Sequence, residues 1–465
     1  MTRPASGIVH LGLGAFFRAF GCVYVADAMA ASGGDWGIVG VSLRSPATRD
    51  ALRGHDWSYA SVTLAPEGED IREINVLNDV LVAPEDPGQV LAAMADPAIK
   101  IVSLTVTEKG YCHNPASGAL NLDHPDIQAD LINPLPVSAP GFLVRALQMR
   151  RAAGHPAFSV LSCDNLPDNG KLVRAVVLDL ARQIDPDLAA WVAEQGRFPS
   201  TMVDRITPAT TQADIDRIAE RTGKPGGAPV LHEPFSQWAI EDDFVNDARP
   251  DLAAAGAEMV ADVSAHEQMK LRLLNGTHSA LAYTGYLAGH DTIAATVADP
   301  VFAAFVHRLW AEIMPAVTPP DGVDLNAYAD ALFARYANPA IQHRTWQIAM
   351  DGSQKLPQRL LGTIAYNISA GRSVEALSLG VAAWMRYVSG VDEAGQVIDV
   401  RDPMAAHLFE ISTAQDSVED KVAALLSVAE VFPTELATQL RTPVTEAAWR
   451  LWTLGARKAL EEHNG

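Results

Sequence analysis

The chain opens with the stretch GIVHLGLG at residues 7–14, a short apolar run that ends in a Gly-Leu-Gly turn. Residues 16–29 follow with helical spacing and almost no helix breakers, and residues 32–35 (SGGD) form a loop. Residues 36–43 (WGIVGVSL) then repeat the apolar strand pattern. This succession is a β-turn-α-β unit, which typically opens a doubly wound parallel sheet, so it predicts an α/β fold.

Two kinds of pattern divide the rest of the chain. Apolar runs predict strands at 73–82, 101–106 and 158–162, with helices at 88–95, 140–153 and 170–184. Beyond about residue 265 the alternation gives way to long helical patterns at 267–288, 299–314, 325–336, 372–388 and 443–462. We expect a Rossmann-type dinucleotide-binding domain over residues 1–265 and a mostly α-helical substrate-binding domain over residues 266–465, with the active site in the cleft between them.

Composition excludes several classes of protein. Of the 465 residues, 48% are hydrophobic and 20% are charged, a balance that is typical of a folded chain and not of a disordered one. The 35 Lys and Arg residues against 56 Asp and Glu residues give a net charge of −21. A body this acidic repels nucleic acid and anionic membrane surfaces, so neither is an expected partner.

The cysteines argue against a disulfide framework and against a metal site. Cys22, Cys112 and Cys163 lie far apart with no Cys-x-x-Cys pair, and the sequence shows no Cys/His/Asp ligand spacing of a metal-dependent alcohol dehydrogenase. No apolar run reaches the roughly 18 residues of a membrane span. We expect a cytoplasmic protein, a monomer or weak homo-oligomer, whose partner is a small molecule.

The Gly-Leu-Gly turn favours dinucleotide binding. Gly12 and Gly14 permit a tight turn and let a pyrophosphate approach the backbone at a helix start. A lone Gly-x-Gly is also an ordinary turn, and Phe17 stands where a complete fingerprint has a third glycine. The acidic residue usual about 20 positions further on, for a ribose hydroxyl, is missing after the second strand. Arg44 stands there instead, which leaves NADP open beside NAD.

A second cluster of polar residues begins the predicted helical domain. At about 100° per residue, Glu267, Lys270, Asn275 and His278 fall on one side of an α-helix. A solvated helix face is the alternative interpretation, but the apolar residues 280–287 that follow favour a lined pocket. A buried lysine loses affinity for its proton, so it can act as a general base near neutral pH.

Three polar segments come at or just beyond the ends of predicted strands: TVTEKGY at 105–111, SCDNLPDNG at 162–170 and MVDRITP at 202–208. In open α/β sheets, ligands bind outside the carboxyl ends of the strands, where these side chains are expected. The alternative is ordinary turn chemistry, above all for Asp168, Asn169 and Gly170.

Together with GLGAFFRA at 12–19, HEPFSQWAIEDDF at 232–244 and KLRLLNGTHS at 270–279, these segments resemble the polyol-specific long-chain dehydrogenase family, which includes mannitol dehydrogenases and fructuronate reductases. Residues 338–359 resemble the C-terminal half of that family. The resemblance implies metal-free hydride transfer between NAD and a secondary alcohol of a polyol or sugar acid. One departure is Phe20, where the family usually has His.

The resemblance implies roles for the matched residues. Lys270 would be the general acid/base, Asn275 and His278 would position the substrate, Asn165 with its own amide would stabilise the alkoxide, and Glu267 would relay the proton. The cofactor-binding residues that we expect are Gly12, Gly14, Phe16, Arg18, Arg44, Thr107 and Glu108. The substrate-binding residues that we expect are Glu108, Asn165, Asp204, His278, Arg344 and Lys355.

Within the family, residues 105–112 and 343–359 are more similar to fructuronate reductases. A uronate carries a carboxylate, and an acidic protein needs local cations to hold it; the clustered candidates are His343, Arg344, Lys355 and Arg359. A surface face or a cofactor phosphate site is the alternative. We expect interconversion of D-fructuronate and D-mannonate with NAD(H), with a mannitol or other polyol 2-dehydrogenase as the alternative.

Overall fold

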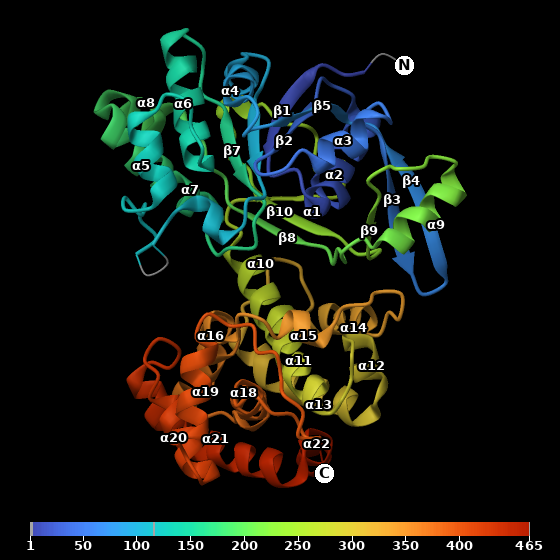
Figure 1. Ribbon diagram of the computed structural model, residues 1–465, viewed down its shortest axis with the longest axis vertical. Coiled ribbons are helices and arrows are strands. Elements are labelled where there is room, and N and C mark those ends of the chain that lie inside the picture. Colours follow the sequence, from blue (N-terminus) through green and yellow to red (C-terminus); the bar gives the residue numbers. More distant parts are fainter. Residues whose placement is uncertain (1–2, 115–116, 465) are drawn as a thin grey trace. The chain divides into compact units, whose positions relative to one another are not determined.

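The computed structural model describes residues 3–114 and 117–464. The chain forms two compact units, the first extending to Ser264 and the second beginning at Ala265 (Figure 1). The first is an α/β unit of the Rossmann type and the second is mostly helical, as the sequence predicts.

A five-stranded parallel sheet forms the centre of the first unit, in the order β5-β2-β1-β6-β7. Its strands are β1 (Ser6–Leu11), β2 (Gly37–Ser42), β5 (Leu77–Val82), β6 (Ile101–Leu104) and β7 (Ser159–Ser162). Every residue of β6 and β7 is buried, as expected for parallel strands covered on both faces. The strand order reverses between β1 and β6, and such a switch point is where ligands bind in sheets of this kind.

Side-chain alternation along β1 supplies two separate apolar cores, because successive residues of a strand point to opposite faces. Val9 and Leu11 pack with one core, whereas Ile8 packs with the other. The helices of this unit are α1 (Ala15–Ala19), α2 (Gly21–Ser32), α3 (Ala47–Arg53), α4 (Pro87–Ala95), α5 (Pro125–Ile132), α6 (Ala139–Ala152), α7 (Asn169–Ile184), α8 (Pro186–Gln195) and α9 (Gln212–Thr222). The helix predicted over 16–29 is broken at Phe20, whose φ of −123° and ψ of −80° separate α1 from α2.

Two smaller sheets flank the main one. The hairpin of β3 (Tyr59–Ala65) and β4 (Gly68–Ile74) pairs with β9 (Val230–His232), and β8 (Thr201–Asp204) pairs antiparallel with β10 (Gln237–Glu241), which pairs with β11 (Glu258–Val260). The single strand predicted over 73–82 is therefore two elements, the end of β4 and all of β5. The segment at 202–208 likewise follows a strand outside the main sheet.

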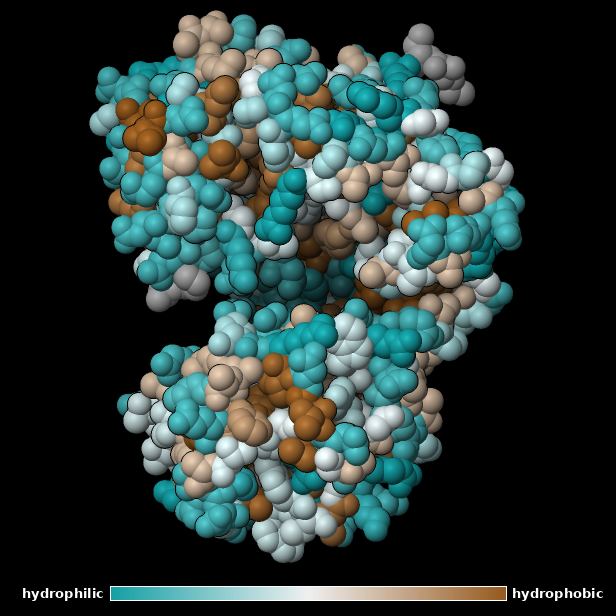
Figure 2. Space-filling view, viewed as in Figure 1, coloured by the Kyte–Doolittle hydropathy of each residue, from teal (hydrophilic) through white to brown (hydrophobic). Residues whose placement is uncertain are grey.

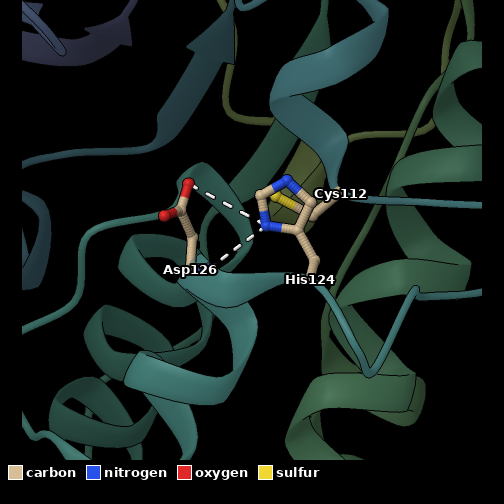
Figure 3. A group of neighbouring side chains, drawn as sticks. All are labelled: Cys112, His124 and Asp126. Atoms are coloured by element: carbon tan, nitrogen blue, oxygen red, sulfur yellow. Dashed lines mark hydrogen bonds and ion pairs between the residues drawn. The ribbon is translucent and has the colours of Figure 1, made fainter.

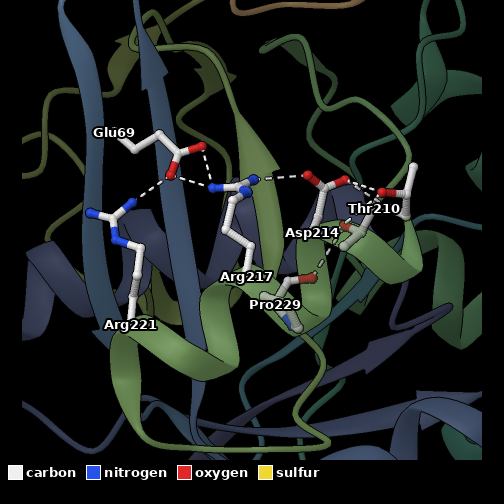
Figure 4. A network of polar contacts seen from close by, with 7 residues as sticks. Glu69, Thr210, Asp214, Arg217, Arg221 and Pro229 are labelled. Atoms are coloured by element: carbon white, nitrogen blue, oxygen red, sulfur yellow. Dashed lines mark hydrogen bonds and ion pairs between the residues drawn. The ribbon is translucent and has the colours of Figure 1, made fainter.

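Ion pairs hold α9 on the hairpin (Figure 4). Glu69 of β4 accepts hydrogen bonds from Arg217 and Arg221, and Arg217 also donates to Asp214 at 2.8 Å. The hairpin and α9 line a cavity of about 280 Å³.

A single apolar core organises the second unit. Its helices are α10 (Ser264–Met269), α11 (Thr277–Leu287), α12 (Ile293–Ala298), α13 (Pro300–Ile313), α14 (Leu325–Tyr336), α15 (Thr345–Ile348), α16 (Gly352–Leu356), α17 (Gly362–Ser369), α18 (Glu375–Val388), α19 (Ala405–Thr413), α20 (Val418–Leu426), α21 (Thr434–Leu454) and α22 (Ala456–Asn464). Every residue of α11 except Tyr286 is buried, so this helix lies in the core and packs against α15 and α18. The helix predicted over 443–462 is two helices that meet at Gly455, whose φ is 82°.

Hydrophilic residues cover most of the visible face of each unit (Figure 2). Among the described residues, the structure contains no helix with the combined length and apolar character of a bilayer span.

Candidate active site

The packing of the protein requires glycine at only one of the two glycine positions of the Gly-Leu-Gly turn. Gly12 has a φ of 92°, and a Cβ atom on it would lie 2.1 Å from the carbonyl oxygen of Thr105, so this position requires glycine. Gly14 has a φ of −90°, and the nearest atom to a Cβ there is the Gly12 oxygen at 3.8 Å. The protein's own packing does not require glycine at position 14, so its exposed backbone suits the close approach of a ligand.

A buried histidine joins this turn to the end of β6. The Thr105 hydroxyl donates to the Gly12 carbonyl at 2.8 Å, so its oxygen accepts from His10 Nε2 at 2.9 Å. His10 Nδ1 then accepts from the Ser103 hydroxyl at 2.8 Å. Burial lowers the pKa of His10 to about 3, so the imidazole is neutral and holds one tautomer at physiological pH.

Arg18 and the aromatic residues beside it pack inside the first unit. The Arg18 guanidinium is buried, donates to the Ala228 carbonyl and lies 5.3 Å above the ring of Tyr59. The structure shows a packing role for Arg18, and its contact with a cofactor stays a prediction. Phe20, which replaces the usual family His, stacks on half-buried Phe16 at 5.1 Å within a cluster of aromatic rings.

The other residues predicted in this unit follow the strands. Arg44 is exposed after β2, Thr107 and Glu108 are exposed after β6, and Asn165 is exposed after β7. Asp204 ends β8 and is buried.

Asn169 ties the ends of β7 and β8 together. Its Nδ2 donates to the carbonyls of Asp164 and Thr201, both at 2.9 Å, and its Oδ1 accepts from the Thr201 amide at 2.9 Å. The polar segment after β7 and the start of β8 therefore lie side by side, although β8 belongs to another sheet. Asn169 is therefore not only a turn residue, because its side chain also joins these two segments.

In the second unit, Lys270 and Asn275 lie on a π-helical turn, Lys270–Gly276, that joins α10 to α11. The α-helical geometry used for the sequence prediction is wrong here, because a π-turn bonds residues five apart and brings these two side chains to the same side. Lys270, Asn275 and His278 are 7%, 8% and 5% exposed, which excludes a solvated helix face. Glu267 is half-buried on α10.

A second π-turn, Pro357–Leu361, packs against the first. Pro357 has no N–H to donate to the preceding helical turn and its ring crowds that turn, which is a common cause of a widened helix. Gly276 faces this turn closely, since a Cβ on it would lie 2.8 Å from the Arg359 carbonyl oxygen. Each π-turn therefore supports the other.

Cationic groups surround the buried His278. Burial lowers its pKa well below 6.5, and the positive charges of Arg335, Arg359 and Lys270 lower it further, as does His343. The His343 ring lies 5.1 Å from the His278 ring, and burial lowers its pKa to about 4. Within the described residues, His278 Nε2 and His343 Nδ1 are buried and have no hydrogen-bond partner.

Lys355 and Arg359 belong to the basic groups near His278 and His343, whereas Arg344 pairs with an aspartate instead. Burial, followed by the charge of Arg359, lowers the pKa of Lys355 to about 8, and its ammonium donates to the Met350 carbonyl at 2.6 Å. The Arg359 guanidinium donates to the Ser279 hydroxyl at 3.0 Å. Arg344 is half-exposed and forms an ion pair with Asp291 at 3.6 Å. We call Lys270, Arg335, Lys355 and Arg359 the cationic cluster.

The structure also brings together Cys112, His124 and Asp126, a set of potential metal ligands that the sequence spacing does not reveal (Figure 3). His124 Nδ1 accepts from the Asp126 amide at 3.2 Å and so caps α5. Burial, with the charges of Asp126 and Asp130, raises the pKa of the Cys112 thiol to about 12. These contacts describe a helix cap beside a protonated thiol.

Each of the two units matches a known family model. Residues 6–254 match the model of the mannitol dehydrogenase Rossmann domain, and residues 262–452 match that of the mannitol dehydrogenase C-terminal domain. The chain is a member of the mannitol dehydrogenase family. It is an NAD-type oxidoreductase of the secondary-alcohol dehydrogenase class.

Individual relatives match over nearly the whole chain. The D-mannonate oxidoreductase of Escherichia coli strain K12 is 47% identical over 99% of this chain and 96% of its own length. A mannitol 2-dehydrogenase of Aspergillus clavatus is 39% identical over 98% of this chain and 93% of its own length. The structure of Pseudomonas fluorescens mannitol 2-dehydrogenase, a ternary complex with NAD and D-mannitol, superposes with a TM-score of 0.87 at 36% identity, covering 99% of this chain and 94% of the other.

Arg335 and Asp164 are not among the site residues that the sequence predicts, although the structure places both in the candidate site. Arg335 comes from α14 and joins the cationic cluster through tertiary packing, so no local spacing points to it. Asp164 lies inside the segment at 162–170 that the sequence already points to, two residues after the buried strand β7, and that position is the signal that could have identified it.

Proposed function

We propose that this mannitol dehydrogenase family member interconverts D-fructuronate and D-mannonate with NAD(H). The observation that carries the proposal is the cationic cluster in a chain whose net charge is −21: Lys270, Arg335 and Arg359 lie near His278, and Lys355 lies near Arg359. Buried cationic groups form strong, charge-assisted hydrogen bonds with a carboxylate because little water screens them. A sugar acid offers such a carboxylate, whereas an uncharged polyol does not. The similarity to D-mannonate oxidoreductase supports the same substrate.

The residues of the first unit fit a nicotinamide cofactor. Gly12 shapes the turn after β1, and Gly14 leaves the backbone open at the start of α1. NAD is preferred because the related mannitol 2-dehydrogenase structure contains NAD. Arg44, exposed after β2 in place of an acidic residue, is the feature that favours testing NADP as well. When bound, the reduced cofactor supplies the hydride for the carbonyl carbon.

The residues of the second unit handle the proton and hold the sugar. Lys270 donates a proton to the carbonyl oxygen during reduction and removes it during oxidation, as a positioned amine can. Asn275 and His278 hydrogen-bond the reacting oxygen, and the buried, unpartnered Nε2 of His278 suits this role. Asn165 of the first unit stabilises the developing alkoxide. Glu267, partly exposed on α10, relays the proton to solvent.

A second candidate is mannitol 2-dehydrogenase activity, which the 36% identical mannitol complex favours. Steady-state kinetics with fructuronate and fructose, each with NADH and NADPH, separates the two. We expect kcat/KM with fructuronate and NADH to exceed the other three values. A higher kcat/KM for fructose would replace our proposal with the polyol dehydrogenase.

A cytoplasmic location and a monomeric or weakly associated state also stay proposals. Cys22, Cys112 and Cys163 are buried free thiols, as expected in a reducing compartment. Sedimentation analysis of the purified protein would test the state of association.

A further inference from the structure

One buried carboxylate joins the segments that follow the neighbouring strands β6 and β7. Asp164 Oδ1 accepts from the Thr107 amide at 2.9 Å, and Oδ2 accepts from the Val106 amide at 2.9 Å and the Tyr111 hydroxyl at 2.7 Å. The Tyr111 oxygen also lies 2.6 Å from the Ser162 hydroxyl. The two backbone amides follow β6, whereas Asp164 follows β7. Hydrogen bonds to a charged acceptor are strong when water is excluded, and Asp164 is only 9% exposed.

The backbone that Asp164 binds is strained. Thr107 has a φ of 66° and a ψ of 165°, a region that is essentially reserved for glycine. Among the described residues, Thr107 is the only β-branched residue with a positive φ. Such a conformation persists only where the surroundings enforce it, and the bond from the Thr107 amide to Asp164 is one such constraint. Strain of this kind concentrates at functional sites.

The main chain of Asp164 fixes the next peptide as well. Its carbonyl oxygen accepts from Asn169 Nδ2 at 2.9 Å, and the structure has no cis peptide bond among the described residues. In a trans peptide the C=O and N–H point in opposite directions, so the Asn165 amide points away from Asn169. The direction of the amide beside the expected oxyanion side chain is therefore set by Asp164 and Asn169.

We propose that Asp164 is a positioning residue, which holds the strained Thr107 turn and the Asn165 peptide in the arrangement that the reaction needs. This inference rests on the proposed function, because that function gives Asn165 the role of stabilising the alkoxide. Donors that are fixed before the reaction need no reorganisation as charge develops on the oxygen, and this is how they accelerate the chemical step. Asp164 itself touches neither substrate nor cofactor in this scheme.

The test compares Asp164→Asn with Asp168→Asn. Asparagine keeps the size of Asp164 but replaces one oxygen with an NH₂ group, which cannot accept a backbone N–H. Asp168 lies in the same motif and pairs with Lys171 at 2.6 Å on the surface. We expect kcat of Asp164→Asn to fall roughly 10- to 10³-fold, comparable to the loss of an oxyanion donor. The primary deuterium isotope effect on kcat should rise as hydride transfer slows.

A second measurement does not depend on activity. Hydrogen exchange of the peptide containing residues 105–111 should accelerate at least tenfold in Asp164→Asn and stay unchanged in Asp168→Asn. Tyr111→Phe removes one hydrogen-bond donor to Asp164 and keeps the two backbone amide donors. The exchange rate of the same peptide in this variant should lie between those of the other two variants. The proposal requires both the fall in kcat and the faster exchange. If kcat of Asp164→Asn fell only because the variant misfolds, the isotope effect would stay unchanged, and this result would contradict the proposal. Wild-type hydrogen exchange or a wild-type kcat in Asp164→Asn would contradict it as well. A wild-type protein inactive on both sugars would refute the proposed function, while exchange would still test Asp164.

Discussion

The carbonyl oxygen of Arg359 lies 2.8 Å from the position that a Cβ atom on Gly276 would occupy. Gly276 ends the π-turn that contains Lys270 and Asn275, and Arg359 belongs to the π-turn that begins at Pro357. Two irregular helical turns thus meet backbone to backbone, and their contact sets where Lys270 and Asn275 lie.

Gly276→Ala should therefore disturb both stability and catalysis. The added methyl must displace backbone, and overpacking of this kind costs about 1–3 kcal/mol in unfolding free energy. We expect kcat to fall more than cofactor affinity, because Lys270 and Asn275 shift while the first unit is unchanged. Urea denaturation and steady-state kinetics measure the two effects.

The matched control is Gly362→Ala, at the start of α17. A Cβ there meets no atom within 4 Å, and the residue has helical φ and ψ. This substitution should stabilise the protein by about 0.4–1 kcal/mol through the entropy of the unfolded chain. Equal effects of the two substitutions would show that the contact between the π-turns is unimportant.

Gly12→Ala and Gly14→Ala should fail in different ways. A methyl on Gly12 collides with Thr105 at a backbone conformation that alanine rarely adopts, so we expect poor folding. A methyl on Gly14 has room within the protein, so this variant should unfold like the wild type but bind NADH at least tenfold more weakly. Thermal unfolding and a fluorescence titration with NADH distinguish the outcomes. Unchanged NADH binding by Gly14→Ala would place the cofactor elsewhere.

The sequence predicts the main sheet well because its strands are apolar and short, and glycine or loop residues separate them from helices. It does not predict the β3–β4 hairpin, since β4 (GEDIREI) is mostly charged and pairs at the surface. The π-turn at Lys270 is also invisible in a helical pattern, because only its tertiary contact with Pro357–Leu361 distinguishes it from an α-helix. Cys112, His124 and Asp126 meet for a similar reason: a loop, and not a spacing, brings them together.

Lys270→Ala should abolish most turnover and leave cofactor binding intact. Proton transfer by a positioned group contributes about 10²–10⁴-fold, so kcat should fall by that factor. The NADH dissociation constant should change less than twofold, because Lys270 belongs to the second unit and the cofactor-binding turn to the first. Lys458→Ala, an exposed lysine on α22, is the control. Activity within tenfold of the wild type would remove Lys270 from the role of general acid/base.

Buried neutral histidines should make the protein less stable in mild acid. The folded-state pKa of His10 is depressed to about 3 from 6.5, so below pH 6.5 the unfolded chain binds a proton that the folded chain does not. Its contribution is complete above pH 6.5 and is lost as the pH falls from there toward 3. Between pH 7.5 and 5.0 this single group should cost about 2 kcal/mol of unfolding free energy. Urea denaturation at both pH values should show the loss, and His10→Gln should reduce the difference; an identical difference in the variant would rule out His10 as a source.

Lys355→Met should change which sugar the enzyme prefers. Methionine keeps an unbranched apolar chain in place of the lysine stem but removes the charge, so a carboxylate loses one partner of the cationic cluster and an uncharged sugar loses none. We expect kcat/KM for fructuronate to fall about 10- to 100-fold, as for a charged hydrogen bond worth roughly 1.5–3 kcal/mol, with the value for fructose nearly constant. Lys458→Met should alter neither value. A parallel fall in kcat/KM for both sugars would mean that Lys355 supports the fold of the site and does not recognise the carboxylate. The mannitol dehydrogenase alternative would then gain support.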